Sequence, residues 1–492
     1  MKVAICASEV VPFAKTGGLA DVAGALPLAL EALNQQVIVI MPRYKAIQDP
    51  NPTGMDLPNP AGIGLPKPLK EGPKPFKEGS KFKLKRVKDD ISSAVIGKNV
   101  QVYFIEKEAY FNRDTLYGDK NGDYPDNLDR FAYYSRRALE LLKDIDFKAD
   151  IIHCHDWQSG LIPVYLKSGY GDSDFFKKTK TVFTIHNIGY QGLFNKGEFP
   201  KLGLDWSLFN MEMLEFYDKI NVLKGGIVFS DIVNTVSPTY SKEIQTKEFG
   251  FGLEGVLNKR RASLFGILNG LDYSIWNPLT DKCIAKDFSE KTIEDKSLDK
   301  EDLQAFCKLP VKNDVPLFGV VSRLAEQKGF DIIGSGIEKI CKMGLQLVIL
   351  GTGDLKYHLL LEEIAGKYPK TVSLHLKFDD ALAHKIYAGS DLFLMPSKYE
   401  PCGLGQLISL RYGTIPLVFK TGGLADTITE KNGFIFDAYK EEALLKTMKE
   451  AITAYKNKKE WLGLVRKAMQ CDFSWEGAAK NYLRLYEKAR AK

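Results

Sequence analysis

The sequence predicts an α/β protein with two domains, each built on a parallel β-sheet. Short apolar runs recur along the chain with helical patterns between many of them, as parallel strands with crossover helices require. The heptapeptide Lys-Thr-Gly-Gly-Leu-Ala-Asp occurs twice, at residues 15–21 and 420–426, each time between a strand pattern and a helix pattern. The length of 492 residues exceeds what one core usually holds. These three observations together favour two α/β domains.

Ten apolar runs predict the strands. In the first half they lie at residues 3–7, 37–40, 102–105, 151–154, 182–185 and 232–236. In the second half they lie at residues 317–321, 347–350, 392–395 and 415–419. Several are unbroken apolar runs, which is the pattern of strands covered on both faces. Ligands of such sheets bind outside the carboxyl ends of the strands, so the segments that follow these runs are the candidate sites.

Helices are predicted at residues 21–34, 128–145 and 441–455, and a last helix ends near Ala491 with no strand after it. Residues 50–79 contain eight prolines and five glycines, which predicts a long surface loop. That loop could be a mobile flap or an inert insertion. Residues 117–127 also read as loop. We place the domain boundary near residues 269–272, because a polar segment follows and a new series of strands begins at 317.

The composition, with 45% hydrophobic and 26% charged residues, is that of a globular protein. The net charge of +6 comes from 68 basic and 62 acidic residues that are not clustered, so binding to nucleic acid or to a membrane is not expected. Seven cysteines without a C-x-x-C pair predict neither a zinc ribbon nor a disulfide framework, and they favour a reducing compartment. The first strand begins at residue 2, which leaves no signal peptide pattern, and no apolar stretch reaches membrane-spanning length. A cytoplasmic location is therefore expected.

The repeated heptapeptide predicts an anion site. Each copy reads as a glycine turn before a helix, where free backbone N–H groups and the helix dipole favour negative charge. Two copies suggest a phosphate-bearing ligand held by two domains. The alternative is that glycine turns end many β-α units for steric reasons alone.

Two adjacent strand ends in the first half carry polar side chains. One strand runs into His153, His155, Asp156 and Trp157, and the next ends at His186. A metal site needs three or more ligands, and this pattern supplies too few for zinc. The functional interpretation is that Asp156 and the histidines meet a polar ligand, whereas a lone histidine in such a place is more often structural.

In the second half, Arg323 and Lys328 follow a strand and could bind one anionic group, because a planar guanidinium fork and a compact ammonium both suit phosphate. They could also be two solvated cations. Glu400 and Cys402 precede a predicted helix N-terminus, and a lining role for Cys402 is preferred over a nucleophilic one. A full G-x-G-x-x-G is absent, as is a P-loop, so neither a nicotinamide fingerprint nor a Walker motif is supported.

Taken together, these motifs resemble bacterial glycogen synthases and plant starch synthases, a family of retaining glycosyltransferases. The likeness covers nearly the whole chain, with the motifs in the family's order. They are Lys15–Asp21, His153–Trp157, Thr184–Gly192, Thr235–Tyr240, Leu268–Asp272, Ser322–Arg323 with Gln327–Gly329, and Glu400–Leu404.

The resemblance implies the GT-B type of fold, in which two Rossmann-like domains face a deep cleft. Residues 1–270 would form the catalytic and acceptor domain, residues 271–471 the nucleotide-sugar-binding domain, and residues 472–492 a helix crossing back to the first domain. It further implies transfer of glucose from ADP-glucose to the non-reducing end of an α-1,4-glucan (glycogen or starch) with retention of configuration. No cofactor and no metal are expected. The location would be the cytoplasm, or the plastid stroma for a mature plant chain.

The resemblance also assigns residues. Catalytic roles are implied for His186, Asp156, Arg323, Lys328 and Glu400. Substrate-binding roles are implied for Lys15, Gly17, Gly18, Asp21, Asn269, Phe378, Cys402, Gly403, Leu404, Thr421 and Gly422. Arg323 and Lys328 would hold the diphosphate and stabilise the leaving group, because donors aimed at developing charge lower the barrier.

Three departures from the family's pattern stand out. Cys154 replaces a frequent alanine, and Lys377-Phe378-Asp379 stands where many relatives have Gly-Tyr or Gly-Phe, so Phe378 could stack on adenine without a hydroxyl. The proline-rich segment at 50–79 matches no family motif.

Several alternatives stay open. Retention could use a carboxylate nucleophile or same-face attack assisted by the departing phosphate. The rival functions are a synthase that uses UDP-glucose, a glucan phosphorylase, for which no pyridoxal-phosphate lysine site is recognisable, and a non-catalytic glucan-binding protein.

Overall fold

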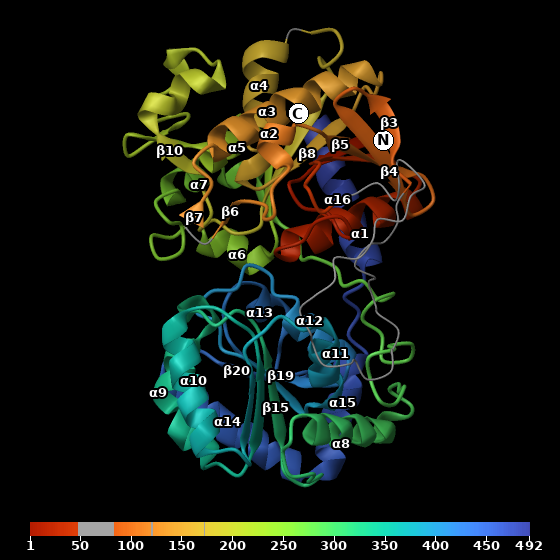
Figure 1. The fold of residues 1–492 in the computed structure, drawn as a ribbon, viewed down its shortest axis with the longest axis vertical. Helices are drawn as coiled ribbons and strands as arrows, with labels where there is room; N and C mark the ends of the chain where they lie inside the picture. The colour runs from red at the N-terminus through yellow and green to blue at the C-terminus, as the bar shows by residue number, and fades with distance from the viewer. Residues whose placement is uncertain (48–82, 120–121, 172) are drawn as a thin grey trace, which may run out of the picture. The chain divides into compact units, whose positions relative to one another are not determined.

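The computed structural model describes residues 1–47, 83–119, 122–171 and 173–492 (Figure 1). The predicted loop at 50–79 therefore lies outside the described residues. Contacts within the chain divide the rest into two compact units. Unit 1 contains the described residues from Met1 to Gly270 together with Trp475–Lys492, and unit 2 contains Leu271–Ser474. Each unit is an α/β layer structure around a parallel sheet, so the predicted fold class is confirmed.

Unit 1 is built on a nine-stranded sheet. Seven neighbouring strands are parallel, and β4 and β3 continue the sheet antiparallel at one edge. In sheet order the strands are β14 (Leu264–Gly266), β13 (Ile232–Thr235), β9 (Lys180–Ile185), β8 (Ile151–His155), β1 (Lys2–Cys6), β2 (Gln36–Pro42), β5 (Val100–Ile105), β4 (Ile91–Ile96) and β3 (Lys85–Lys88). The chain proceeds from β1 toward β2 on one side and later from β8 toward β9 on the other. The crevice beside the ends of β1 and β8 is therefore the topological switch point, where α/β sheets bind ligands.

Helices cover both faces of this sheet. The α-helices of unit 1 are α1 (Gly18–Ala32), α2 (Glu108–Phe111), α3 (Asn127–Asp144), α4 (Leu161–Tyr165), α5 (Val222–Phe229), α6 (Pro238–Glu243), α7 (Glu254–Lys259) and α16 (Trp475–Arg490). The C-terminal helix α16 packs against α1 and β9, and Figure 1 draws it in dark blue beside the red α1. Its Tyr482 and Tyr486 are fully buried in the core of unit 1. The two ends of the chain thus complete one core.

Unit 2 is built on six parallel strands in the order of a doubly wound Rossmann sheet. They are β17 (Val372–His375), β16 (Gln346–Leu350), β15 (Leu317–Val321), β18 (Leu392–Met395), β19 (Ile415–Phe419) and β20 (Phe434–Phe436). Its α-helices are α8 (Lys296–Phe306), α9 (Phe330–Cys341), α10 (Leu355–Lys367), α11 (Asp380–Gly389), α12 (Gly405–Arg411), α13 (Gly422–Thr427), α14 (Glu441–Lys456) and α15 (Lys458–Met469). Figure 1 shows α9 and α10 on one face of this sheet and α8 and α11 on the other. The switch point here lies between β15 and β18.

Each of the ten predicted runs contains a strand, and helices α1, α3 and α14 match their predicted ranges within a few residues. The short edge strands β3, β14, β17 and β20 were not predicted. The loop predicted at 117–127 is wrong in part, because β6 (Gly118–Asp119) and β7 (Gly122–Asp123) pair there. A further small sheet of β10 (Leu193–Asn195), β12 (Lys219–Asn221) and β11 (Glu215–Phe216) lies outside the predicted pattern. Strands of two or three residues give too short a pattern to recognise, and the four-residue strands β3 and β17 are interrupted by polar side chains.

Candidate functional site at the carboxyl ends of the two sheets

The first heptapeptide lies between β1 and α1, and a buried carboxylate binds its backbone. Gly17 is the N-cap of α1. The carboxylate of Glu9 accepts hydrogen bonds from the backbone N–H groups of Thr16 and Gly17, and from the Thr16 hydroxyl at 2.7 Å. A helix N-terminus attracts negative charge, and here an internal side chain supplies it. The sequence pattern indicated an anion at this turn but did not single out Glu9.

Lys15 and Asp21 of the same heptapeptide form an ion pair at the surface, with the Lys15 Nζ 2.7 Å from an Asp21 carboxylate oxygen. Gly17 has an extended backbone with φ of −153°, and a Cβ added there would meet no atom within 4 Å. Neither strain nor crowding therefore requires a glycine at this position. Gly18 begins α1 directly after it.

Three histidines form a chain of contacts at the ends of β8 and β9. His153 bridges the Tyr486 hydroxyl at 2.8 Å and the Thr184 hydroxyl at 2.7 Å. The Nδ1 of His155 lies 2.9 Å from the Nε2 of His186. Burial lowers the pKa of His153 and of His186 to about 3, so both rings are neutral at physiological pH. His153 is therefore part of the core, whereas His186 is held at the strand end by His155.

Asp156 follows β8 with an unusual backbone, because its φ of +55° lies in a region that non-glycine residues rarely adopt. Its Oδ1 accepts a hydrogen bond from the His186 backbone N–H at 2.7 Å. Burial raises the pKa of Asp156 to about 7, and the charge of Glu9 acts in the same direction. The switch point of unit 1 thus brings Glu9, Asp156 and His186 together, as expected for the ends of adjacent parallel strands.

A pocket of about 410 Å³ opens in unit 1 next to these strand ends. Aromatic side chains and a few polar groups line it: Asp123, Asn127, Trp157, Tyr190, Gln191, Phe194, Phe216 and Phe251 among others. Gln191 is fixed by the Asn221 side chain and by the Phe251 carbonyl. Flat apolar rings combined with amide and carboxylate groups suit a ligand that has both apolar faces and hydroxyl groups. Asn269, which the resemblance also implicated, is buried in unit 1.

In unit 2, the ends of β15 and β18 meet through an ion pair. The Lys328 Nζ lies 2.6 Å from an oxygen of Glu400, and the Ser397 hydroxyl donates to the same oxygen at 2.9 Å. Both charged side chains are largely buried, with 17% and 7% of their surface exposed. Lys328 therefore holds a fixed position at the switch point. No role was assigned to Ser397 from the sequence.

Arg323 lies in the same loop as Lys328. Its Nη2 donates to the Gln327 side chain at 3.3 Å, and Gln327 in turn donates to the Tyr399 carbonyl at 3.4 Å. Gly329, with φ of +82°, turns the chain into α9, and a Cβ there would lie 2.3 Å from the Pro396 carbonyl oxygen. The loops after β15 and β18 therefore pack tightly together. Phe378 is 87% exposed, after β17.

The second heptapeptide packs against the loop after β18. The Gly423 backbone N–H donates to the Glu400 carbonyl at 3.0 Å. A Cβ on Gly423 would lie 2.0 Å from the Cys402 carbonyl oxygen, so this glycine is required by packing. Gly403 adopts φ of +73°, and Leu404 is the N-cap of α12. Thr421 and Cys402 are buried beside them. The Gln406 side chain donates to the Cys402 carbonyl and helps to fix this loop.

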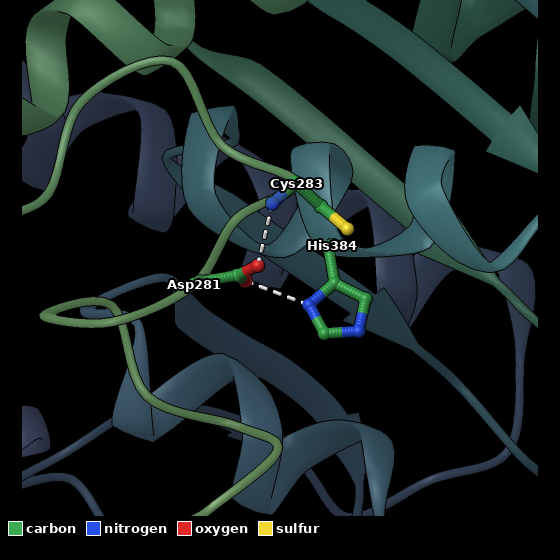
Figure 2. A group of neighbouring side chains, drawn as sticks. All are labelled: Asp281, Cys283 and His384. Atoms are coloured by element: carbon green, nitrogen blue, oxygen red, sulfur yellow. Dashed lines mark hydrogen bonds and ion pairs between the residues drawn. The ribbon is translucent and has the colours of Figure 1, made fainter. Parts of the chain in front are cut away.

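One group among the described residues has the composition of a metal site, namely Asp281, Cys283 and His384, whose ligand atoms lie within 4.8 Å of one another. Figure 2 shows the His384 Nδ1 directed at the Asp281 carboxylate, 2.6 Å away, and the other ring nitrogen on the far edge of the ring. Tyr412 donates to the same carboxylate, and Trp276 stacks on the ring at 4.1 Å. Burial raises the pKa of the Cys283 thiol to about 11. Because its groups bond to one another and its thiol stays protonated, we assign this cluster a structural role.

The comparisons with known proteins cover the whole chain. Residues 2–259 match the starch synthase catalytic domain, and residues 303–462 match the glycosyl transferases group 1. The chain is 46% identical to a glycogen synthase of Geotalea uraniireducens and 47% identical to one of Pseudothermotoga lettingae, over 100% of this chain and 99% of each relative.

Solved structures agree with these matches. The catalytic domain of starch synthase IV from Arabidopsis thaliana, bound to ADP and acarbose, is 35% identical with a TM-score of 0.84 and is covered to 99%. A sucrose-phosphate synthase from Thermosynechococcus elongatus shares the fold alone, at 17% identity and a TM-score of 0.61. The described helices include none that is both long and apolar enough to span a membrane. The fold is of the GT-B class, and the chain belongs to the glycogen synthase and starch synthase family of glucosyltransferases.

Proposed function

We propose that the chain transfers glucose from ADP-glucose to the non-reducing end of an α-1,4-glucan, with retention at the anomeric carbon. The observation that carries most weight is the likeness, over the entire chain, to a starch synthase domain bound to ADP and acarbose. ADP is the product of such a transfer, and acarbose is a glucan-like oligosaccharide. The names of the full-length relatives point to the same reaction.

In this proposal unit 2 acts on the diphosphate. Arg323 and Lys328 supply positive charge at the switch point, and Glu400 with Ser397 fixes the Lys328 ammonium before the donor arrives. Charge that develops on the departing ADP is then stabilised by a group that needs no reorganisation. Thr421, Gly422, Cys402, Gly403 and Leu404 would shape the pocket for the donor. Phe378 would stack on the base.

Unit 1 acts on the glucose units. Lys15, Gly17, Gly18, Asp21 and Asn269 would contact the donor, and Asp156 with His186 would surround the reacting sugar. His186 is neutral and Asp156 has a pKa of about 7, so either can take part in a hydrogen bond or a proton transfer near neutral pH. The aromatic pocket of unit 1 would bind the acceptor glucan, because the faces of glucose rings stack on aromatic side chains.

The reaction requires no cofactor and no metal in this proposal, because the two cations of unit 2 neutralise the leaving diphosphate. We further propose that the enzyme works in the cytoplasm, where its seven free cysteines stay reduced.

The test is incorporation of labelled glucose into glycogen from ADP-glucose and, in parallel, from UDP-glucose. We expect transfer from ADP-glucose and much less from UDP-glucose. Nuclear magnetic resonance of the product should show new α-1,4 linkages, which establishes retention. If neither donor gives transfer, the synthase function is refuted. If both donors are used equally, the assignment of ADP-glucose as the donor is refuted.

A further inference from the structure

We infer that Glu9 is a positioning residue for the donor site of unit 1. It would fix the backbone of Thr16 and Gly17, and thereby the place of Lys15 and the start of α1. This inference rests on the proposed function, because it concerns how the sugar nucleotide is held. Glu9 matched none of the motif residues to which the resemblance gave a role.

The contacts of Glu9 carry the argument. Its side chain is 3% exposed. One carboxylate oxygen accepts from the backbone N–H groups of Thr16 and Gly17, and the other accepts from the hydroxyls of Thr16 at 2.7 Å and Tyr117 at 2.6 Å. Both carboxylate oxygens of Glu9 are thus bound, one by the heptapeptide alone and the other by the heptapeptide and Tyr117. No ion pair with Glu9 occurs among the residues that the structure describes.

Such a carboxylate is costly to bury without a cation, unless several donors replace its hydration. Here four donors do so, and the positive end of the α1 dipole adds to them. A core that needed only shape would use an apolar side chain at this place. The presence of a charged acceptor therefore indicates that Glu9 fixes the conformation of the loop at Thr16 and Gly17.

Tyr117 supports Glu9 from the other side. Its hydroxyl lies 2.7 Å from the Ser8 hydroxyl and donates to Glu9. Burial raises the pKa of Tyr117 well above its ordinary value, so the phenol stays protonated and remains a donor. Ser8, Glu9 and Tyr117 thus form one network that ends at Thr16.

The neighbourhood of Glu9 joins this network to the reaction centre. Glu9 follows β1 and Asp156 follows β8, and these strands are adjacent in the sheet. Burial raises the pKa of Asp156, and the negative charge of Glu9 acts in the same direction. A change at Glu9 should therefore reach both Lys15 and Asp156.

The experiment measures steady-state kinetics for ADP-glucose and for glycogen in Glu9→Gln, Thr16→Val and Thr16→Ser. Glu9→Gln should lower kcat/KM for ADP-glucose about 100-fold, because displacing a binding group by about 1 Å typically costs that much. Thr16→Val should lower it about tenfold through the loss of one hydrogen bond to a charged group. Thr16→Ser keeps the hydroxyl and should stay near wild type. The KM for glycogen should not change in any of them.

Glu31→Gln is the matched control. Glu31 lies near the other end of α1, and its carboxylate likewise accepts from two backbone N–H groups, those of Lys98 and Asn99. Its loss should affect folding stability but not donor kinetics. Titration calorimetry with ADP-glucose adds a measurement that does not depend on turnover, and Glu9→Gln should bind the donor more weakly.

Donor kinetics within twofold of wild type in both Glu9→Gln and Thr16→Val would overturn the inference. An equal loss in Glu31→Gln, or a matching rise in the KM for glycogen, would also overturn it. If Glu9→Gln does not fold, the comparison of Thr16→Val with Thr16→Ser decides. A wild-type enzyme that transfers no glucose refutes the proposed function instead, so the two failures are distinguishable.

Discussion

At the scale of single residues, the charged groups of both sheets are held in environments that change their protonation or fix their position. Asp156 combines a rare backbone conformation with a raised pKa, and Lys328 is fixed by a buried partner. Strain and burial of this kind lower stability and are retained where function needs them. Both residues therefore give predictions in which stability and activity respond differently.

The pKa of Asp156 predicts how stability depends on pH. Its ordinary value is 3.8 and its value in the folded protein is about 7, so the folded state binds this proton more tightly than the unfolded state. The stability from Asp156 is therefore largest below about pH 4 and is lost as pH rises toward 7. Asp156→Asn removes this loss. As pH rises from about 5 to about 7, the free energy of unfolding of Asp156→Asn should rise relative to that of the wild type by about 2 kcal/mol.

Urea unfolding of both proteins across this range measures the difference. The buried histidines have lowered pKa values and the opposite dependence, with stability lost as pH falls below about 6.5. The contribution of the histidines is the same in wild type and in Asp156→Asn, so it cancels in the difference between their free energies of unfolding. A difference that stays constant with pH would contradict the raised pKa of Asp156.

If Lys328 binds the leaving diphosphate as proposed, Lys328→Ala should lower kcat about 100–1000-fold, because it removes a preorganised donor. It also leaves the buried Glu400 carboxylate with the Ser397 hydroxyl as its side-chain donor, which should cost about 1–3 kcal/mol in the free energy of unfolding. Turnover with saturating ADP-glucose and denaturant unfolding measure the two effects.

The control is Lys339→Ala, which breaks an equally short pair with Glu441 on the surface of unit 2. Both turnover and unfolding should stay close to wild type there, because exposed pairs contribute little. If the two variants lose the same activity, Lys328 has no particular role in catalysis.

At the scale of elements, the two identical heptapeptides do different work. The first copy leaves open space around Gly17 and binds an internal carboxylate, whereas the second presses Gly423 against the loop after β18. The two turns therefore have different surroundings, although Gly423 corresponds in position to Gly18 and not to Gly17. The sequence alone could not separate these roles, because they depend on what lies opposite each turn.

Gly423→Ala should reduce the free energy of unfolding by about 1–3 kcal/mol, because a Cβ at 2.0 Å from a backbone oxygen forces the two loops apart. Gly17→Ala meets no such obstacle and should change it by less than about 0.5 kcal/mol. Gly17→Ala should nevertheless raise the KM for ADP-glucose, since in the proposed function the added methyl group would occupy space next to the donor. Thermal unfolding and donor kinetics of both variants test this, and a strongly destabilised Gly17→Ala would contradict it.

Much of the fold was accessible from the sequence. The central strands could be predicted because buried parallel strands are continuous apolar runs, such as residues 37–40 and 347–350. Edge strands such as β17 and β20 carry only three or four residues and give no clear pattern. The site residues at strand ends could be proposed from motifs, but Glu9 and Tyr117 could not, because their contact joins residues 108 positions apart.

At the scale of the whole molecule, the chain builds two separate hydrophobic cores. The core of unit 1 extends from β1 to α16 and includes both ends of the chain, and the core of unit 2 is made of residues from Leu271 to Met469. Unit 1 is therefore discontinuous in sequence, and its final helix is reached only after unit 2 has been completed. We expect two cores of this kind to unfold in separate transitions, so each free energy of unfolding given above is that of the unit that contains the residue.

Calorimetry should accordingly resolve two transitions, each sensitive to one buried tyrosine. Tyr486→Phe removes the hydroxyl that bonds the buried His153 in unit 1. Tyr455→Phe removes the hydroxyl that accepts from Lys300 and donates to the Asn313 carbonyl in unit 2. Each loss should cost about 1–3 kcal/mol, which corresponds to a fall in Tm of about 2–12 °C for a unit of this size. Tyr486→Phe should lower one transition and Tyr455→Phe the other, whereas a single transition lowered by both variants would show that the units unfold together.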